Sequence, residues 1–280
     1  MVERAVIAEL ADRLRRAEVD RVPIDPVTDD RPDLSVDDAY AVQTHNVDRR
    51  VAAGAVACGH KIGLTSRASQ ELLGVHEPTF GALLDDMFVE ECDEVELDAL
   101  MQPRVEAEMA FVMASDLAGP GVTTTRALAA IGGVAPAIEV VDSRIADWRI
   151  RLADTVADNA SAARVVLGAR ITPVAGLDLR LVGVLFHRNG APIDSGAGAA
   201  VLGNPARCVA WLANRLGSLG AGLRRGDVVL PGALHRMVPV RPGDVFQARF
   251  AHLGSVTVQF SGAARFSGAQ STGTQRQAGP

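Results

Sequence analysis

Strict alternation of apolar and polar positions marks one stretch of the chain, residues 102–113 (QPRVEAEMAFVM). The apolar side chains that recur at every second position are Val105, Ala107, Met109, Phe111 and Met113. A period of two predicts a β-strand with one fully apolar face. Glu106 and Glu108 then share the opposite face, roughly 7 Å apart at Cβ. The pattern therefore predicts a strand that carries two carboxylates side by side.

Apolar residues at helical spacing predict the elements at the start of the chain. Their period favours a helix over residues 2–17. Ser35, followed three positions later by Asp38, resembles a variant capping box that opens a second helix reaching about Ala53. The stretch between these helices, residues 22–35, is rich in Pro and Asp and is expected to be a loop.

Further elements follow from short apolar runs and capping residues. The run around Lys61 predicts a strand that ends in a glycine-containing turn, and a second apolar strand contains Glu139. Thr124 is the expected cap of one helix. Asn204 is the expected cap of another, over residues 205–219. The chain is thus expected to mix helices with many short strands.

Composition narrows the class of protein. The 280 residues are 48% hydrophobic with a mean hydropathy of +0.15, which is typical of a compact chain. The net charge is −6 and the 28 basic residues are dispersed, so no nucleic-acid partner is expected. No apolar run approaches the roughly 20 residues that span a bilayer, and the amphipathic, acid-containing N-terminus is not a signal peptide. Three widely spaced cysteines favour a reducing cytoplasm.

The carboxylates are the first candidates for chemistry. Glu106 and Glu108 would repel each other on an otherwise apolar strand, unless the strand is a solvent-exposed edge where both are hydrated. Glu139 lies between Ile138 and Val140, where a lone charge is costly. Three such carboxylates suggest an oxygen-ligand site for Mg²⁺ or Mn²⁺.

Two other polar features have an ordinary and a chemical interpretation. Lys61 in an apolar run either extends its amine to water from an edge, which the run alone favours, or is held in a pocket for catalysis. Asp158, Asn159 and Ser161 stand close together before an apolar strand, and such residues often only build turns.

Seven stretches of the sequence, taken in order, match a known pattern: KIGLTS (61–66), QPRVEAEMAFV (102–112), PAIEVVDSRIADW (136–148), DTVADNAS (154–161), LGNP (202–205), RGDVVLPGALHRMVPVRPGD (225–244) and LGSVTVQF (253–260). Together they closely resemble the 2-keto-4-pentenoate (2-hydroxypenta-2,4-dienoate) hydratases of the fumarylacetoacetase-like superfamily. The resemblance runs from about Ala39 to Gly262.

The resemblance implies an α+β fold: a mixed β-roll catalytic core with an N-terminal α/β portion. The expected division is 1–75 for the N-terminal portion, 76–263 for the catalytic domain and 264–280 for a disordered tail. It also implies a homo-oligomer, a pentamer or decamer. Association with a neighbouring pathway enzyme is a further expectation.

The resemblance also implies an activity and a set of residues. The enzyme would be a hydro-lyase that adds water to 2-hydroxypenta-2,4-dienoate or a close homologue, giving a 4-hydroxy-2-oxo acid in the meta-cleavage degradation of aromatic compounds. Mg²⁺ or Mn²⁺ would be held by the carboxylates matching Glu106, Glu108 and Glu139. The expected catalytic groups are Lys61, Asp158 and Ser161, and the expected substrate contacts are Asn159, Thr65 and Leu84. A dication would lower the pKa of the neighbouring lysine, which suits proton transfer.

One departure from the pattern affects the acid–base chemistry. Many relatives carry aspartates in a V-D-x-P-D-F-G segment, whereas this chain has His76 and Thr79 at those two positions. An acid–base role for an aspartate there does not carry over, and Glu77 is a doubtful substitute.

Two other functions fit the same residues. One is decarboxylation of 2-oxo-hex-3-enedioate (4-oxalocrotonate) on the same scaffold, although the GALHRMVPV segment favours hydration. The other is a non-catalytic scaffold, which would not require three costly carboxylates beside a lysine.

Overall fold

The part of the chain that the structure describes, residues 2–261, folds around two β-sheets. In this computed structural model the larger sheet has eight strands, in the order β2 (Thr79–Leu84), β1 (Ala57–Gly63), β10 (Val228–Leu230), β5 (Arg104–Met113), β6 (Ile131–Val141), β7 (Ala162–Leu167) and β3 (Phe88–Val89), with β11 (Val238–Pro239) paired to β5. The smaller sheet has the order β4 (Glu94–Glu96), β13 (Gly254–Ser261), β12 (Val245–Phe250), β8 (Gly183–Arg188) and β9 (Ala191–Ala197).

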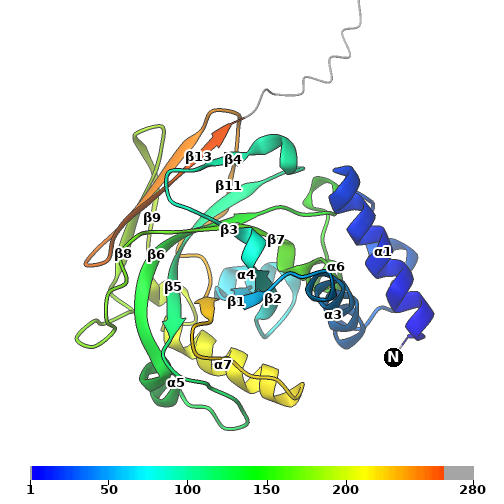
Figure 1. Ribbon diagram of the computed structural model, residues 1–280, viewed down its shortest axis with the longest axis horizontal. Helices are drawn as coiled ribbons and strands as arrows, with labels where there is room; N and C mark the ends of the chain where they lie inside the picture. The colour runs from blue at the N-terminus through cyan, green and yellow to red at the C-terminus, as the bar shows by residue number, and fades with distance from the viewer. Residues whose placement is uncertain (1, 262–280) are drawn as a thin grey trace, which may run out of the picture.

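Helices flank the larger sheet on two sides (Figure 1). They are α1 (Arg4–Asp20), α2 (Val27–Asp30), α3 (Val36–Ala52), α4 (Arg67–Leu73), α5 (Thr124–Ala130), α6 (Leu152–Ala157) and α7 (Pro205–Ser218). The pair α1 and α3 packs together with α6 on one side, and α5 packs on α7 at another. None of the helices within residues 2–261 is long and apolar enough to cross a membrane. The mixture of helices and curled mixed sheets confirms the α+β class.

The strand β5 lies at the centre of the larger sheet. It confirms the strand that the alternation of apolar and polar residues predicted. Its odd-numbered apolar residues, from Val105 to Met113, are at most 1% exposed and join a core with phenylalanines of the smaller sheet, such as Phe246. The opposite face continues into a second apolar cluster that includes Ala110 and Leu230. Both faces are therefore buried, and the solvent-exposed edge considered for the two glutamates is excluded.

The antiparallel pairing of β5 with β6 brings the three glutamates together. Glu106 lies directly opposite Glu139, and Glu108 lies opposite Ala137. Because alternate residues share a face and paired residues project on the same side, all three carboxylates point from one face of the sheet. The site is thus fixed by strand register rather than by a loop.

Most expected elements are confirmed, with small changes at their ends. Ser35 caps α3 by accepting a hydrogen bond from the Asp38 backbone N–H (3.1 Å), and Asn204 caps α7 in the same way. The cap of α5 is Thr123 and not Thr124, since the Thr123 hydroxyl accepts from the Arg126 N–H. The expected loop at 22–35 contains the one-turn helix α2, because the Asp154 carboxylate accepts hydrogen bonds from both the N–H and the hydroxyl of Thr28.

The expected domain division stays a prediction. The strand β1, which precedes residue 75, pairs in parallel with β10 and antiparallel with β2 inside the larger sheet. The expected tail, 264–280, lies outside the described residues.

Candidate metal and substrate site

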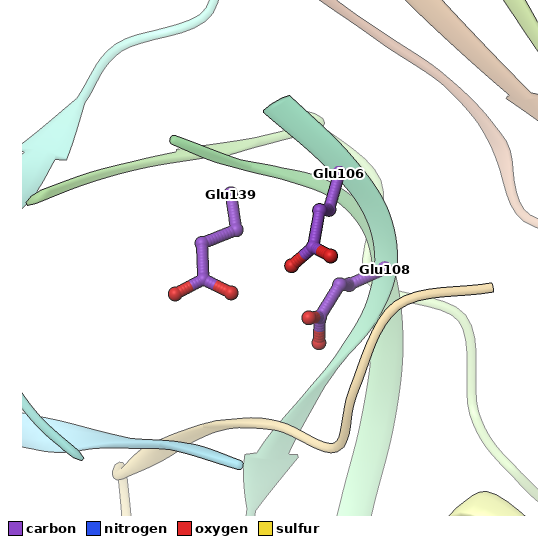
Figure 2. A group of neighbouring side chains, drawn as sticks. All are labelled: Glu106, Glu108 and Glu139. Atoms are coloured by element: carbon purple, nitrogen blue, oxygen red, sulfur yellow. The ribbon is translucent and has the colours of Figure 1, made fainter. Parts of the chain in front are cut away.

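Three carboxylates converge at the centre of the larger sheet (Figure 2). Glu106, Glu108 and Glu139 each offer one oxygen within 4.8 Å of the others. Glu108 is 1% exposed and Glu139 is 0% exposed, so these two side chains are almost completely buried. Both oxygens of Glu139 lack a well-aligned hydrogen-bond donor among the described residues. A buried carboxylate without donors is costly, and this cost needs a compensating partner.

The protonation of the cluster reflects that cost. Burial, and then the charge of Glu139, raise the pKa of Glu106 to about 7. Burial and the charges of Glu139 and Glu106 also raise the pKa of Glu108. Desolvation and like charge both disfavour the ionised form, so the three groups together attract either protons or a cation.

Among the described residues, Lys61 is the one cation that forms an ion pair with these carboxylates. Its Nζ lies 3.1 Å from Glu139 Oε1 and donates to the backbone carbonyl of Ala160 at 3.0 Å. The side chain is 4% exposed, which excludes an amine that extends from an edge into water. Burial opposes its charged form, but the three carboxylates outweigh burial and raise the pKa of Lys61. The lowered pKa expected from the sequence refers to a lysine beside a bound dication, whose charge would act against that of the carboxylates, and it stays a prediction.

The turn that receives the lysine is strained. Asn159, Ala160 and Ser161 adopt consecutive positive φ values of 51°, 49° and 57°. Residues with side chains rarely occupy this region, and such strain persists where the surroundings impose it. The turn directs the Ala160 carbonyl at Lys61 and leaves the Ser161 hydroxyl buried without a hydrogen-bond partner in the structure.

The segment after β10 forms the opposite wall of the site. The Gly232 N–H donates to Glu108 Oε2 at 2.8 Å. Gly232 has φ +124°, and a Cβ there would lie 1.9 Å from the Thr65 hydroxyl oxygen, so only glycine fits. His235 accepts a hydrogen bond from the Ala107 N–H on Nε2, and its Nδ1 lies 2.7 Å from the Arg236 carbonyl. With both ring nitrogens engaged, His235 ties this wall to β5.

A cavity of about 450 Å³ opens between these walls. Lys61, Glu106 and Ser161 line it together with Thr65 and apolar side chains. The site thus combines a charged cluster with a largely apolar enclosure, as small-molecule sites commonly do.

The residues present fit a divalent cation. Three hard oxygen ligands converge, both Glu139 oxygens lack a well-aligned donor among the described residues, and the cluster has two more carboxylates than ammonium groups. Mg²⁺ and Mn²⁺ prefer such oxygen ligands, and a charge of +2 would balance the cluster.

Three expected site residues do not face this cavity. Asp158 is engaged by Arg144, which donates to it from its backbone N–H (3.0 Å) and from its guanidinium. The Asn159 amide pairs with both backbone groups of Ala82, at 2.8 and 2.9 Å. Leu84 is fully buried and, with Asp158 and Asn159, borders a separate cavity of about 40 Å³. In this structure the three side chains make contacts within the fold, and their expected catalytic and substrate roles stay predictions.

Three other residues of the site were given no role from the sequence. Thr79, noted there only as a departure from the family pattern, lines the cavity, and so do Trp148 and Ile150. One available signal was composition: Lys61 is the only lysine in the chain, and every other basic residue is arginine. Retention of a single amine among arginines fits a role that needs a group able to lose its proton.

Comparison with known proteins identifies the family of the chain. The family model for the fumarylacetoacetate (FAA) hydrolase C-terminal region matches residues 56–261. The chain belongs to the fumarylacetoacetate hydrolase family. Within that family it is 48% identical over 252 residues to a 2-keto-4-pentenoate hydratase of Paraburkholderia xenovorans (strain LB400), covering 90% of this chain and 94% of the relative. The resemblance inferred from the sequence motifs is thereby confirmed.

Two further proteins that are similar to this chain carry names with different activities. A 2-oxo-hept-4-ene-1,7-dioate hydratase of Escherichia coli is 40% identical over 257 residues, covering 90% of this chain and 96% of the relative. The solved 4-oxalocrotonate decarboxylase of Pseudomonas putida G7, complexed with magnesium and adipate, superposes with a TM-score of 0.91 at 38% identity, covering 93% and 99% of the two chains.

Proposed function

We propose that this protein is a metal-dependent hydro-lyase that adds water to 2-hydroxypenta-2,4-dienoate or a close homologue, in the meta-cleavage degradation of aromatic compounds. The product is a 4-hydroxy-2-oxo acid. One observation carries the proposal: three carboxylates and the single lysine meet beside a largely apolar cavity that Lys61 and Glu106 line. The hydratases among its relatives support the choice of reaction.

The reaction needs positive charge near the acidic end of the substrate. Glu106, Glu108 and Glu139 would hold Mg²⁺ or Mn²⁺, which when bound supplies that charge to the substrate carboxylate and 2-oxygen. The protein contributes the rigidity of the site, because the three ligands stand on paired central strands.

Proton transfer is assigned to Lys61. Hydration requires a proton at C5 of the dienol, followed by addition of water at C4 of the resulting unsaturated ketone. The Lys61 amine lines the cavity and is held by the Ala160 carbonyl, so it can hold a proton over the substrate. Ser161 and Thr65, whose side chains line the same cavity, are proposed to donate hydrogen bonds to the substrate or the incoming water.

A side-by-side rate assay tests this function. Freshly generated 2-hydroxypenta-2,4-dienoate and 4-oxalocrotonate are each given to the purified protein, with Mg²⁺ and with a chelator. The expected result is metal-dependent loss of the dienoate with little decarboxylation of the diacid. Faster decarboxylation than hydration would assign the alternative activity, and no turnover of either would favour a scaffold.

Assembly and location remain part of the proposal. A homo-oligomer, a pentamer or decamer, in the cytoplasm and in contact with a neighbouring pathway enzyme fits the family. Light scattering that finds a stable monomer at micromolar concentration would refute the assembly.

A further inference from the structure

The segment that joins β10 to β11 leaves the larger sheet beside the carboxylate cluster. From Val229 to Val238 it advances nine positions, whereas its partners on β5, from Phe111 to Val105, advance six. The extra residues cannot pair in register, so the segment bulges out of the sheet, and residues 233–237 line the cavity. Bulges often occur next to active sites, where they redirect side chains.

The bulge displaces the regular backbone partners of Ala107, the residue between Glu106 and Glu108. Ala107 is 0% exposed, so water cannot replace these partners. Its carbonyl accepts a hydrogen bond from the Leu234 N–H at 3.0 Å. Its N–H donates to a side chain instead of a backbone carbonyl, namely to His235 Nε2 at 3.0 Å. The histidine thus takes the place that a backbone acceptor fills in a regular sheet.

Contacts on two sides hold the imidazole of His235 in place. Because Nε2 accepts a hydrogen bond, the neutral ring carries its proton on Nδ1, which lies 2.7 Å from the Arg236 carbonyl oxygen. The ring also packs on Phe186 of the smaller sheet, with 4.3 Å between the ring centres. Phe186 is 0% exposed and stacks on Phe246. The acceptor for the Ala107 N–H is therefore held by the core between the two sheets.

The hydrogen bonds of Ala107 control the backbone on which two candidate metal ligands stand. Its N–H belongs to the peptide group shared with Glu106, and its carbonyl belongs to the peptide group shared with Glu108. Both glutamates leave β5 on one face, towards Glu139 (Figure 2). A rotation of either peptide group would turn a carboxylate away from the others. Mg²⁺ in particular demands near-ideal placement of its ligands.

We propose that His235 is a positioning residue for the metal site: its Nε2 holds the Ala107 peptide and so fixes the direction of the Glu106 and Glu108 carboxylates towards a divalent cation. The inference rests on the proposed function, from which it takes the metal ligands. The histidine is not itself a ligand, because its Nε2 accepts from a backbone N–H and its Nδ1 faces a carbonyl. Replacing a residue that orients metal ligands typically weakens metal affinity about 10- to 100-fold.

Two substitutions at His235 test the inference by calorimetric titration with Mn²⁺. His235→Phe keeps a ring against Phe186 and removes the acceptor, so Mn²⁺ should bind about 10-fold or more weakly. His235→Gln carries an oxygen the same number of bonds from Cα as Nε2, so its affinity should stay within about 3-fold of the parent. The matched control is His187→Phe, at a partly buried histidine on β8 that does not line the cavity, and its affinity should equal that of the parent.

Melting temperatures show which variants are folded during the titration. His235→Met removes the acceptor with a flexible side chain, in case the phenylalanine variant does not fold. Parental Mn²⁺ affinity in a folded His235→Phe or His235→Met would overturn the inference, and lost turnover with that affinity would assign His235 to the substrate instead. Binding in His235→Gln as weak as in His235→Phe would also overturn it.

Two further outcomes separate this inference from folding and from the proposed function. Loss of the fold in both apolar variants would make the hydrogen bond a requirement for folding and overturn the positioning role. Failure of the parent to bind Mn²⁺ would overturn the proposed function and this inference together, whereas the outcomes at His235 leave the proposed function intact.

Discussion

The described residues include two buried clusters that each contain positive and negative side chains. The clusters differ in how many of their polar atoms have hydrogen-bond partners. In the first, Arg144 and Asp158 form a pair of one cation and one anion, with side chains at most 9% exposed. The arginine also donates to the carbonyls of Asp142 (2.9 Å) and Ala162 (3.2 Å). In the second, Lys61 meets three glutamates, and both oxygens of Glu139 lack a well-aligned donor among the described residues.

The difference separates a structural ion pair from a site for chemistry. A buried pair with balanced charge and full hydrogen bonding needs no further partner, and it leaves no free polar group that could bind a ligand. The Lys61 cluster has excess negative charge, Glu139 oxygens without well-aligned donors and a cavity beside it. A raised carboxyl pKa is common to both groups, since burial raises the pKa of Glu106 to about 7 and that of Asp158 to about 6. Buried polar atoms that lack hydrogen-bond partners at the wall of a cavity are therefore the feature that indicates function here.

The largest effect is expected from Lys61. Lys61→Met keeps an apolar stem and removes the amine, so turnover should fall about 10²- to 10⁴-fold while the Mg²⁺-loaded protein stays folded. Lys61→Arg keeps the charge but cannot give up a proton, so it should be equally inactive if the lysine transfers protons. Steady-state rates and melting temperatures measured with Mg²⁺ check both variants. Near-parental turnover in Lys61→Arg would reduce the lysine to an electrostatic role.

At the Arg144–Asp158 pair the main effect of substitution is expected on stability and not on turnover. Arg144→Met leaves the Asp158 carboxylate buried without its partner and should lower the free energy of unfolding by about 3–5 kcal/mol. The double variant Arg144→Met with Asp158→Leu should recover much of that loss, because no unpaired charge remains. Denaturant unfolding measures all three proteins. If Asp158→Asn abolished turnover with unfolding energy and metal affinity unchanged, Asp158 would belong to the catalytic site after all.

His60 is a partly buried histidine outside both of these groups. Burial lowers its pKa from 6.5 to about 4, and its Nδ1 has no hydrogen-bond partner in the described structure. A lowered histidine pKa contributes stability that is present above pH 6.5 and is lost as the pH falls towards 4, up to about 3 kcal/mol. His60→Phe, which keeps a ring against Phe80, should flatten that acid dependence in unfolding experiments. An unchanged acid profile would contradict the assignment.

The smallest effect on stability is expected at Ser161. Its buried hydroxyl has no partner in the structure, so Ser161→Ala should leave the melting temperature unchanged or slightly higher. If the hydroxyl binds substrate, kcat/KM should fall about 10-fold through the lost hydrogen bond. Unchanged kinetics would show that the hydroxyl is not used.

Features that depend on the spacing of neighbouring residues could be predicted from the sequence. Alternation placed Glu106 and Glu108 on one face, and the apolar surroundings of Glu139 marked it as costly, so the cluster followed once the two strands paired. Capping residues located α3 and α7 for the same reason: the signal lies within one turn of the helix.

What depended on long-range contacts was not predictable. Asp158 and Ser161 are three residues apart, yet one pairs with Arg144 and the other lines the cavity, and residues 159–161 adopt three consecutive positive φ values. The need for glycine at Gly232 arises from Thr65, far away in sequence. Trp148 lines the cavity through contacts with Gln102 and Arg104 that no periodicity reveals.

Direct titration with Mn²⁺ tests the central claim that the unsatisfied carboxylate cluster binds a divalent cation. Calorimetry on the whole chain is compared with Glu106→Gln, and with Glu94→Gln as a matched change at an exposed position on β4. We predict one Mn²⁺ per chain in the parent and in Glu94→Gln, and at least about 10-fold weaker binding in Glu106→Gln. Binding in Glu106→Gln as tight as in the parent would contradict the account.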